Sequence, residues 1–338
     1  MKLLRNSLAS LLLVVFFIGL TTDVNAQDKR KAVQTYNKAL ELVESEDYEQ
    51  AVSMFNQAMT QGEELGEEGQ DIVERVRKQL PSTYYQMALV EYRTFQNNKD
   101  LSSLNATISA FQEAGKVSEE YGSTQIAEKV PGVITQLMYN QALLQYQQEN
   151  FQESLATLDQ VIERNANYAK AYYQKGIIVK NMEGGSMEEA LALFDQAIEV
   201  GNQNNENQIV ASAQEAASEE LVYRGAQAIE ASNYSSSIEL LNQALEYNPS
   251  SVDAHYRLAE AYNGQQQWQE AANAAQKAIE ISNGGRTDKA KTYFSLGTAY
   301  QGMGQRADAC DAFTNAAFGS FKSSAEHKME FELKCDNI

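Results

Sequence analysis

The sequence predicts an all-α fold built from about seven helix hairpins in tandem, and two observations support this. The chain of 338 residues holds only three prolines, and it is rich in Ala, Leu, Glu and Gln, which favour helices over strands. A small, a large and a small side chain also recur at positions i, i+4 and i+7. This spacing places all three side chains on one face of a helix.

The N-terminal residues 1–26 predict a cleaved secretory signal peptide. Lys2 and Arg5 form a basic start, an apolar run from Leu8 to Leu20 follows, and small residues precede the expected cleavage after Ala26. The alternative is an uncleaved membrane anchor, although the apolar run is shorter than the ~18 residues that a span needs. We expect an exported mature chain, without a further segment apolar enough to span a membrane.

Each predicted hairpin has a small residue in its first helix and the spaced triplet in its second. The small residue should let the second helix approach closely. In chain order these residues are Ala39, Ala51, Phe55 and Ala58; Ala88, Thr107, Phe111 and Ala114; Ala142, Ser154, Leu158 and Val161; Gly176, Ala190, Phe194 and Ala197; Gly225, Ser237, Leu241 and Ala244; Ala259, Ala271, Ala275 and Ala278; and Gly297, Ala309, Phe313 and Ala316.

This pattern resembles the tetratricopeptide repeat (TPR) over about residues 31–318. Asn248 and Pro249 match the boundary between two units of that family. The resemblance implies a right-handed superhelical solenoid, which we expect over residues 27–318. The sequence departs from the family in lacking a Trp near the start of the first helix. Its lone Trp268 is expected in the turn between two helices instead.

Three connections between units carry inserts and are nearly twice as long as the standard one. The standard interval from the last triplet residue to the next small residue is 15, whereas the intervals that follow Ala58, Ala114 and Ala197 are 30, 28 and 28. The inserts have helical periodicity, so we expect each to extend the next first helix by about three to four turns. A flexible loop is the alternative. Pro81 and Pro131 should kink or break two of these helices.

Residues 319–338 predict a final helix that caps the array. Ser323 and Glu326 have the spacing of a capping box at its start. Phe331 and Leu333 are expected to cover the exposed end of the last repeat.

The two cysteines, Cys310 and Cys335, lie at equal distances from the turn expected near Lys322. In an antiparallel helix hairpin such residues face one another. In an exported protein this predicts a disulfide between them, which holds the cap in place. The alternatives are two free thiols or a redox pair, although no CxxC motif is present.

Charge and composition argue against several classes of function. The formal net charge of −19 disfavours binding to nucleic acid and to anionic lipid. Two histidines, His255 and His327, are too few and too far apart in the sequence for most metal sites or for a Ser/His/Asp triad. No glycine-rich phosphate loop follows a strand. We therefore predict no catalytic, metal or cofactor site.

In the TPR family the first helix of each unit lines the concave surface, and its position 5 points into it. Here six of the seven residues at position 5 are aromatic, and such a stripe offers rigid contacts to a peptide or helix. The alternative is that these rings pack only between helices. Position 5 is occupied by Tyr36, Tyr85, Tyr139, Tyr173, Val222, Tyr256 and Phe294, and position 12 adds Tyr92 and Tyr146.

Position 9 of the first helix argues against one known binding mode. TPR domains that grip an acidic C-terminal chaperone tail carry Asn there, which this chain lacks. Apolar residues in the first four units indicate an apolar ligand surface or packing against an inserted helix. The residues at position 9 are Leu40, Leu89, Leu143, Ile177, Ala226, Glu260 and Thr298.

The whole pattern is similar to exported TPR proteins of the Bacteroidetes group. The resemblance implies a non-enzymatic scaffold for protein–protein contacts in the periplasm of a Gram-negative bacterium, with an envelope or secretion component as its partner. A carrier or sensor of a small ligand such as a glycan fragment is the alternative, since tyrosine-rich grooves can stack on sugars. An enzyme of unrecognised type is the weakest hypothesis.

Overall fold

The computed structural model describes residues 26–335, which contain helices and turns and no strand. The predicted signal peptide therefore lies outside the described residues, apart from Ala26. The described helices form two compact units, divided between Asn165 and Ala166. The predicted all-α hairpin fold is confirmed. Among the described helices, none is both long and apolar enough to cross a membrane.

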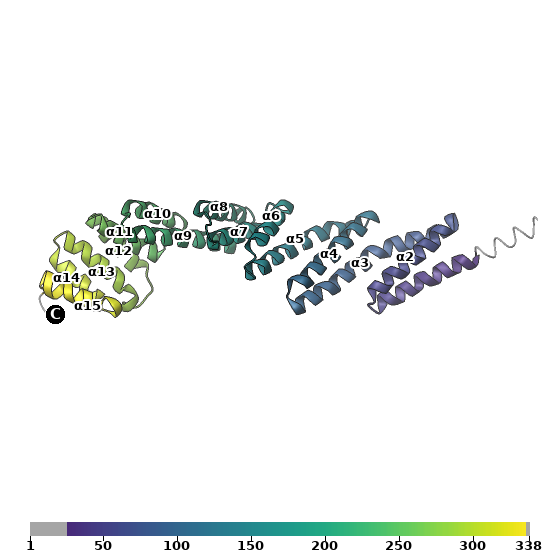
Figure 1. Cartoon of the computed structure of the whole chain (residues 1–338), viewed down its shortest axis with the longest axis horizontal. Coiled ribbons are helices and arrows are strands. Elements are labelled where there is room, and N and C mark those ends of the chain that lie inside the picture. Colours follow the sequence, from purple (N-terminus) through teal and green to yellow (C-terminus); the bar gives the residue numbers. More distant parts are fainter. Residues whose placement is uncertain (1–25, 336–338) are drawn as a thin grey trace, which may run out of the picture. The chain divides into compact units, whose positions relative to one another are not determined.

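The first unit holds three helix hairpins in chain order (Figure 1). Each helix from α2 to α6 packs against its chain neighbour. The hairpins are the helix over residues 26–44 with α2 (Tyr48–Glu64), then, after a 3-10 turn (Gly66–Gly69), α3 (Gln70–Asn98) with α4 (Leu101–Glu120), and finally α5 (Thr124–Gln147) with α6 (Phe151–Arg164).

The second unit holds four further hairpins and the C-terminal cap (Figure 1). The hairpins are α7 (Ala169–Asn181) with α8 (Met187–Gln203), α9 (Asn207–Glu230) with α10 (Tyr234–Tyr247), α11 (Val252–Gly264) with α12 (Trp268–Ile281), and α13 (Arg286–Gly302) with α14 (Arg306–Ala316). The cap consists of η2 (Gly319–Phe321), α15 (Lys322–His327) and the π-helical η3 (Lys328–Leu333). Trp268 is the first residue of α12 and not part of the preceding turn.

The predicted triplets form the core of every hairpin. Every residue at the four recurring positions is buried. The small residue in the first helix is needed for close approach: a methyl group at Gly176 would lie 2.6 Å from a ring carbon of Phe194, and one at Gly297 would lie 2.9 Å from Phe313. Such distances are shorter than van der Waals contact, so a side chain there would push the two helices apart.

The three inserts are helical, and the flexible-loop alternative is wrong. Helices α3, α5 and α9 have 29, 24 and 24 residues, whereas α7 and α11 have 13 each. The preceding second helices also lengthen, since α2, α4 and α8 have 17, 20 and 17 residues and α6 has 14. Each insert is therefore shared between the two helices that it joins.

The predicted break at the two prolines does not occur. Helix α3 continues through Pro81, and α5 continues through Pro131. A proline removes one backbone hydrogen bond and crowds the preceding turn. At Pro81 this cost is offset by tertiary packing, because Leu80, Pro81 and Thr83 are all buried.

The first helices of neighbouring hairpins also touch one another. Besides the contacts between chain neighbours, a small contact joins α3 with α5 in the first unit. In the second unit, larger contacts join α7 with α9, α9 with α11, and α11 with α13. No comparable contact joins two second helices of the described hairpins. In the second unit the first helices are therefore more closely spaced, and their side is the inner side.

The predicted disulfide between Cys310 and Cys335 is present, and the two Cα atoms are 5.9 Å apart. The bond ties α14 to the end of the cap. Arg306, at the start of α14, adds a hydrogen bond from Nε to the carbonyl oxygen of Leu333 (2.7 Å) and a second one to the carbonyl of Lys334. These contacts hold the cap against the last repeat.

Two details of the predicted cap are wrong. Helix α15 begins at Lys322, and no side chain caps its start, so Ser323 and Glu326 form no capping box. Phe331 does not cover the repeat, because 62% of its surface is exposed. The packing face is instead formed by Ala325, Met329 and Leu333, which recur every four residues and contact the core around Phe313.

Candidate binding surfaces on the first helices

The aromatic stripe at position 5 packs within the hairpins. Several of its rings contact the large triplet residue of their own second helix in tilted or edge-on geometry. This contact joins the two helices of a hairpin and occupies one side of each ring. The ring centroids are 5.6 Å apart in Tyr36–Phe55, 5.6 Å in Tyr85–Phe111, 6.1 Å in Tyr173–Phe194 and 5.3 Å in Phe294–Phe313.

Exposure divides the predicted binding residues into two groups. Tyr36 and Tyr256 are 8% and 6% exposed, so they offer almost no surface to a partner. The other residues keep part of their surface accessible and remain candidates. They are Tyr85, Tyr92, Tyr139, Tyr146, Tyr173 and Phe294.

In the first unit, the neighbouring first helices α3 and α5 form a cavity of about 560 Å³. Its apolar lining consists of Phe95 from α3 and of Leu143 and Leu144 from α5. We call these three residues the apolar surface. Their polar neighbours in the cavity are Gln96, Lys99, Asn140 and Gln147. A cavity with an apolar lining and a mainly uncharged polar edge suits an apolar side chain of a partner.

Two of the predicted tyrosines lie beside aromatic rings near this surface. The ring of Tyr92 is 6.3 Å from that of Phe95, and the ring of Tyr146 is 5.7 Å from that of Phe151. Both tyrosines were predicted from the sequence, whereas Phe95 was not. The signal was present, because Phe95 follows Tyr92 by three residues and so lies on the same face of the helix.

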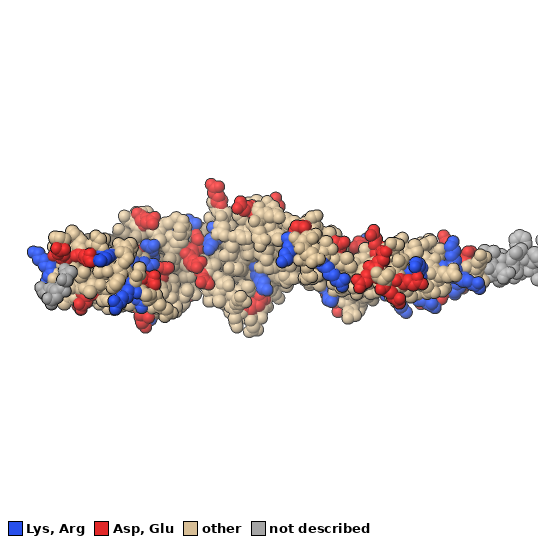
Figure 2. Space-filling view, turned by 90° about the horizontal axis from the view of Figure 1, so that it is seen from below, with Lys and Arg blue, Asp and Glu red and all other residues tan. Residues whose placement is uncertain are grey.

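In the second unit, first helices α9, α11 and α13 form a groove of about 580 Å³ with a different chemistry. We call it the charged groove. Five charged side chains line it, together with the exposed ring of Tyr223: Glu215, Glu219, Asp253, Arg257 and Lys291. Lys291 Nζ lies 2.7 Å from Asp253 Oδ1 and bridges α13 to α11. Acidic and basic side chains are likewise interspersed on the face drawn in Figure 2.

Tyr256 lies beneath two cations next to this groove. Lys291 Nζ is 4.5 Å from its ring centroid, and the guanidinium of Arg257 is 5.2 Å from it. Its hydroxyl donates a 2.7 Å hydrogen bond to Glu260 Oε1. Burial and this bond raise the pKa of Tyr256 well above its usual value. Tyr256 therefore holds charged groups beside the groove and offers little surface of its own.

The residues at position 9 take three different roles. Leu143 lines the apolar surface and Ala226 lines the charged groove. Glu260 accepts hydrogen bonds from Tyr256 and Arg257. The other members, Leu40, Leu89, Ile177 and Thr298, are half-buried.

The side chain of His255 is half-buried and contacts the backbone. Its Nε2 lies 3.2 Å from the carbonyl oxygen of Pro249, at the boundary between two repeats. Burial lowers the pKa of His255. The described residues hold no group of three or more His, Cys, Asp or Glu side chains that could bind a metal ion.

Comparison with protein-family models gives one match. The tetratricopeptide repeat model matches residues 139–205 and residues 224–286. These two segments are tetratricopeptide repeats. They include the apolar residues Leu143 and Leu144, part of the charged groove, and the recurring residues of four predicted hairpins. No curated protein matches the chain.

Solved structures with a similar course of the chain include MamA, YrrB and a domain of yeast Sti1. MamA from Desulfovibrio magneticus RS-1 is 22% identical; the match covers 60% of this chain and 97% of that one, with a TM-score of 0.35. YrrB, described as a TPR protein with an unusual peptide-binding site, is 20% identical over 58% of this chain and 91% of its own, with a TM-score of 0.35. The TPR2AB domain of yeast Sti1, in complex with pHSP90, is 14% identical over 73% and 96%, with a TM-score of 0.30.

Proposed function

We propose that this protein is a non-enzymatic scaffold that binds a partner protein in the bacterial periplasm. The observation that carries the proposal is the apolar surface of the first unit. Phe95, Leu143 and Leu144 line an open cavity on the first helices and are only half-buried. The partner is a component of the cell envelope or of a secretion system.

The chemistry of the apolar surface favours a peptide or helix as the bound segment. Aromatic and aliphatic anchors that fill a pocket dominate the binding energy of protein interfaces. An amphipathic helix presents such anchors at i, i+3, i+4 and i+7. Tyr92 and Tyr146 lie next to Phe95 and Phe151, and they supply further ring surface beside the cavity.

Two features support a location outside the cytoplasm. Residues 1–26 have the pattern of a signal peptide. The Cys310–Cys335 disulfide is of a kind that persists in oxidising compartments such as the periplasm. Together they favour an exported, periplasmic protein.

The test is a crosslinked pull-down from the envelope of the source organism. We expect the Phe95→Ser/Leu143→Ser variant to recover a partner at least about fivefold less efficiently than the wild type, because both anchors are removed. Leu155→Ser is the matched control, since Leu155 is also half-buried but lies on the second helix α6. Equal recovery by all three proteins would contradict the proposal.

A further inference from the structure

A second groove in the first unit lies apart from the apolar surface and shares no residue with it. It has a volume of about 440 Å³. Its walls come from the turn and first residues of α2, from α3, and from the second helix α4. It is therefore not a continuation of the first-helix surface. We call it the acidic groove.

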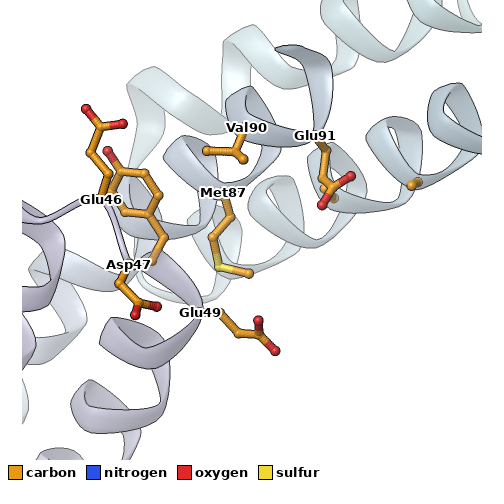
Figure 3. Close-up of a pocket in the computed structure, with 9 residues that line it drawn as sticks. Glu46, Asp47, Glu49, Met87, Val90 and Glu91 are labelled. Carbon is orange, nitrogen blue, oxygen red and sulfur yellow. The ribbon is translucent and has the colours of Figure 1, made fainter. Parts of the chain in front are cut away.

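The floor of the acidic groove is apolar and accessible. Met87 and Val90 of α3 lie at its centre (Figure 3). Val90 is 37% exposed and is one of the few large apolar side chains on the described surface. Ala106 and Ala110 of α4 have short side chains and leave space beside them. An apolar side chain of a partner would bury this floor.

Four carboxylates surround this floor: Glu46, Asp47, Glu49 and Glu91 (Figure 3). Asp47 is occupied as the N-cap of α2, where Oδ1 accepts a 3.3 Å hydrogen bond from the backbone N–H of Gln50. Glu46 Oε2 lies 3.7 Å from Arg93.

Glu49 and Glu91 have no ion-pair or hydrogen-bond partner among the residues that the structure describes. No Lys or Arg lines the groove. Two unpaired negative charges therefore flank the apolar floor. A ligand that brings positive charge would pair with both.

We propose that the acidic groove binds a basic amphipathic segment of a partner protein, with one apolar side chain on Met87 and Val90 and Lys or Arg beside Glu49 and Glu91. Charge complementarity selects this occupant, because like charges at an interface repel and opposite charges steer association. The net charge of −19 over the whole chain acts in the same direction.

The probe is a short dye-labelled helical peptide made only of Lys and Leu, with Leu at helical spacing, and binding is measured by fluorescence anisotropy. The Glu49→Lys/Glu91→Lys variant should bind it about tenfold or more weakly, because two attractions become repulsions. The matched control is Glu74→Lys/Glu128→Lys, which changes the net charge equally at exposed positions outside the groove. It should differ from the wild type by less than about twofold, since exposed charges are screened by salt.

Two further variants test the location. Val90→Ser removes part of the floor from a position that is already exposed, and it should weaken binding about three- to tenfold. Leu155→Ser, on the second helix α6 outside both the acidic groove and the apolar surface, should leave binding of the Lys/Leu peptide unchanged. Circular dichroism confirms that each variant is folded.

Several results would overturn the proposal. They are the absence of binding to the wild type, equal losses in the two charge-reversal variants, or equal binding of a Glu/Leu peptide with the same spacing. If only Phe95→Ser/Leu143→Ser lost binding of the Lys/Leu peptide, the binding site would be the apolar surface and not the acidic groove. Self-association that disappears in Glu49→Lys/Glu91→Lys, measured by sedimentation, would assign the groove to a second copy of this chain.

Discussion

The two units use the same hairpin core but present different surfaces on their first helices. In the first unit that face carries the apolar surface of Phe95, Leu143 and Leu144. In the second it carries the charged groove, where Lys291 pairs with Asp253. The core triplets are alike in both, so they set only how the helices pack. The binding chemistry depends on residues outside the triplet.

The units also differ in the features that stabilise them. The first has two long first helices, α3 and α5, produced by the inserts. The second alternates standard and long hairpins and ends in a cap fixed by the Cys310–Cys335 disulfide. In a repeat protein each hairpin is supported only by its neighbours, so the last hairpin needs such a cap.

The largest expected effect is on the free energy of unfolding, when a core residue of one unit is truncated. Phe111→Ala in the first unit and Phe194→Ala in the second each remove a buried ring from a triplet. Each should lower the free energy of unfolding of its own unit by about 3–5 kcal/mol. Hydrogen exchange resolved along the chain measures this. If either change lowered protection equally in both units, the units would not be independent in stability.

Removal of the disulfide should act on one end of the second unit. In Cys310→Ser/Cys335→Ser, we expect the C-terminal part to lose roughly 3 kcal/mol of stability, because the open chain gains conformational freedom. Exchange should increase in α14 and α15 and stay unchanged in α2 to α6. An increase that begins in the first unit would show that the bond does more than hold the cap.

A pair of glycine substitutions tests the close approach of helices. Gly176→Ala places a methyl group 2.6 Å from Phe194 and should destabilise the second unit by about 1–3 kcal/mol. Gly132→Ala is the matched control in α5, where nothing lies within 4 Å of the new methyl group. It should stabilise the first unit by about 0.5–1 kcal/mol through helix propensity. Thermal denaturation of both variants measures the difference, and the same sign in both would contradict the packing argument.

The smallest expected effect is a pH dependence confined to the second unit. Burial lowers the pKa of His255 in the folded protein, so the unfolded chain binds the proton more readily. The stability that neutral His255 contributes is complete above its unfolded pKa of about 6.5. It is lost as the pH falls through the lowered pKa of the folded protein. His255→Gln should flatten the decline in unfolding free energy between about pH 6.5 and 5. A decline of unchanged steepness would mean that other groups cause it.

Much of the fold could be predicted from the sequence because close packing restricts the residues at each triplet. Gly176 and Gly297 sit where no larger side chain fits beside Phe194 and Phe313, so their spacing indicates the hairpins directly. The disulfide followed from the turn between the cysteines. The cap was harder to predict, because Phe331 and Leu333 are both apolar. Only the four-residue spacing of Leu333 with Ala325 and Met329 distinguishes the packed side chain from the exposed one.

The candidate surfaces could be predicted only in part. Position 5 locates aromatic rings on the first helices, but a ring there can pack on its own second helix, as Tyr36 does on Phe55. The cavity beside Phe95 and the acidic groove arise where two or three helices meet. Glu49 and Met87 are distant in the sequence and share no helical period, so no spacing rule brings them together.

The most direct test of the account is photo-crosslinking from single positions. A benzoylphenylalanine placed at Leu143, on the apolar surface, is compared with one at Gln160, which is exposed on the second helix α6. We expect Leu143 to yield one dominant crosslinked partner in envelope extracts and Gln160 to yield none. The same partner captured equally well from Gln160, or no partner from Leu143, would contradict the claim that the first helices of the first unit form the binding face.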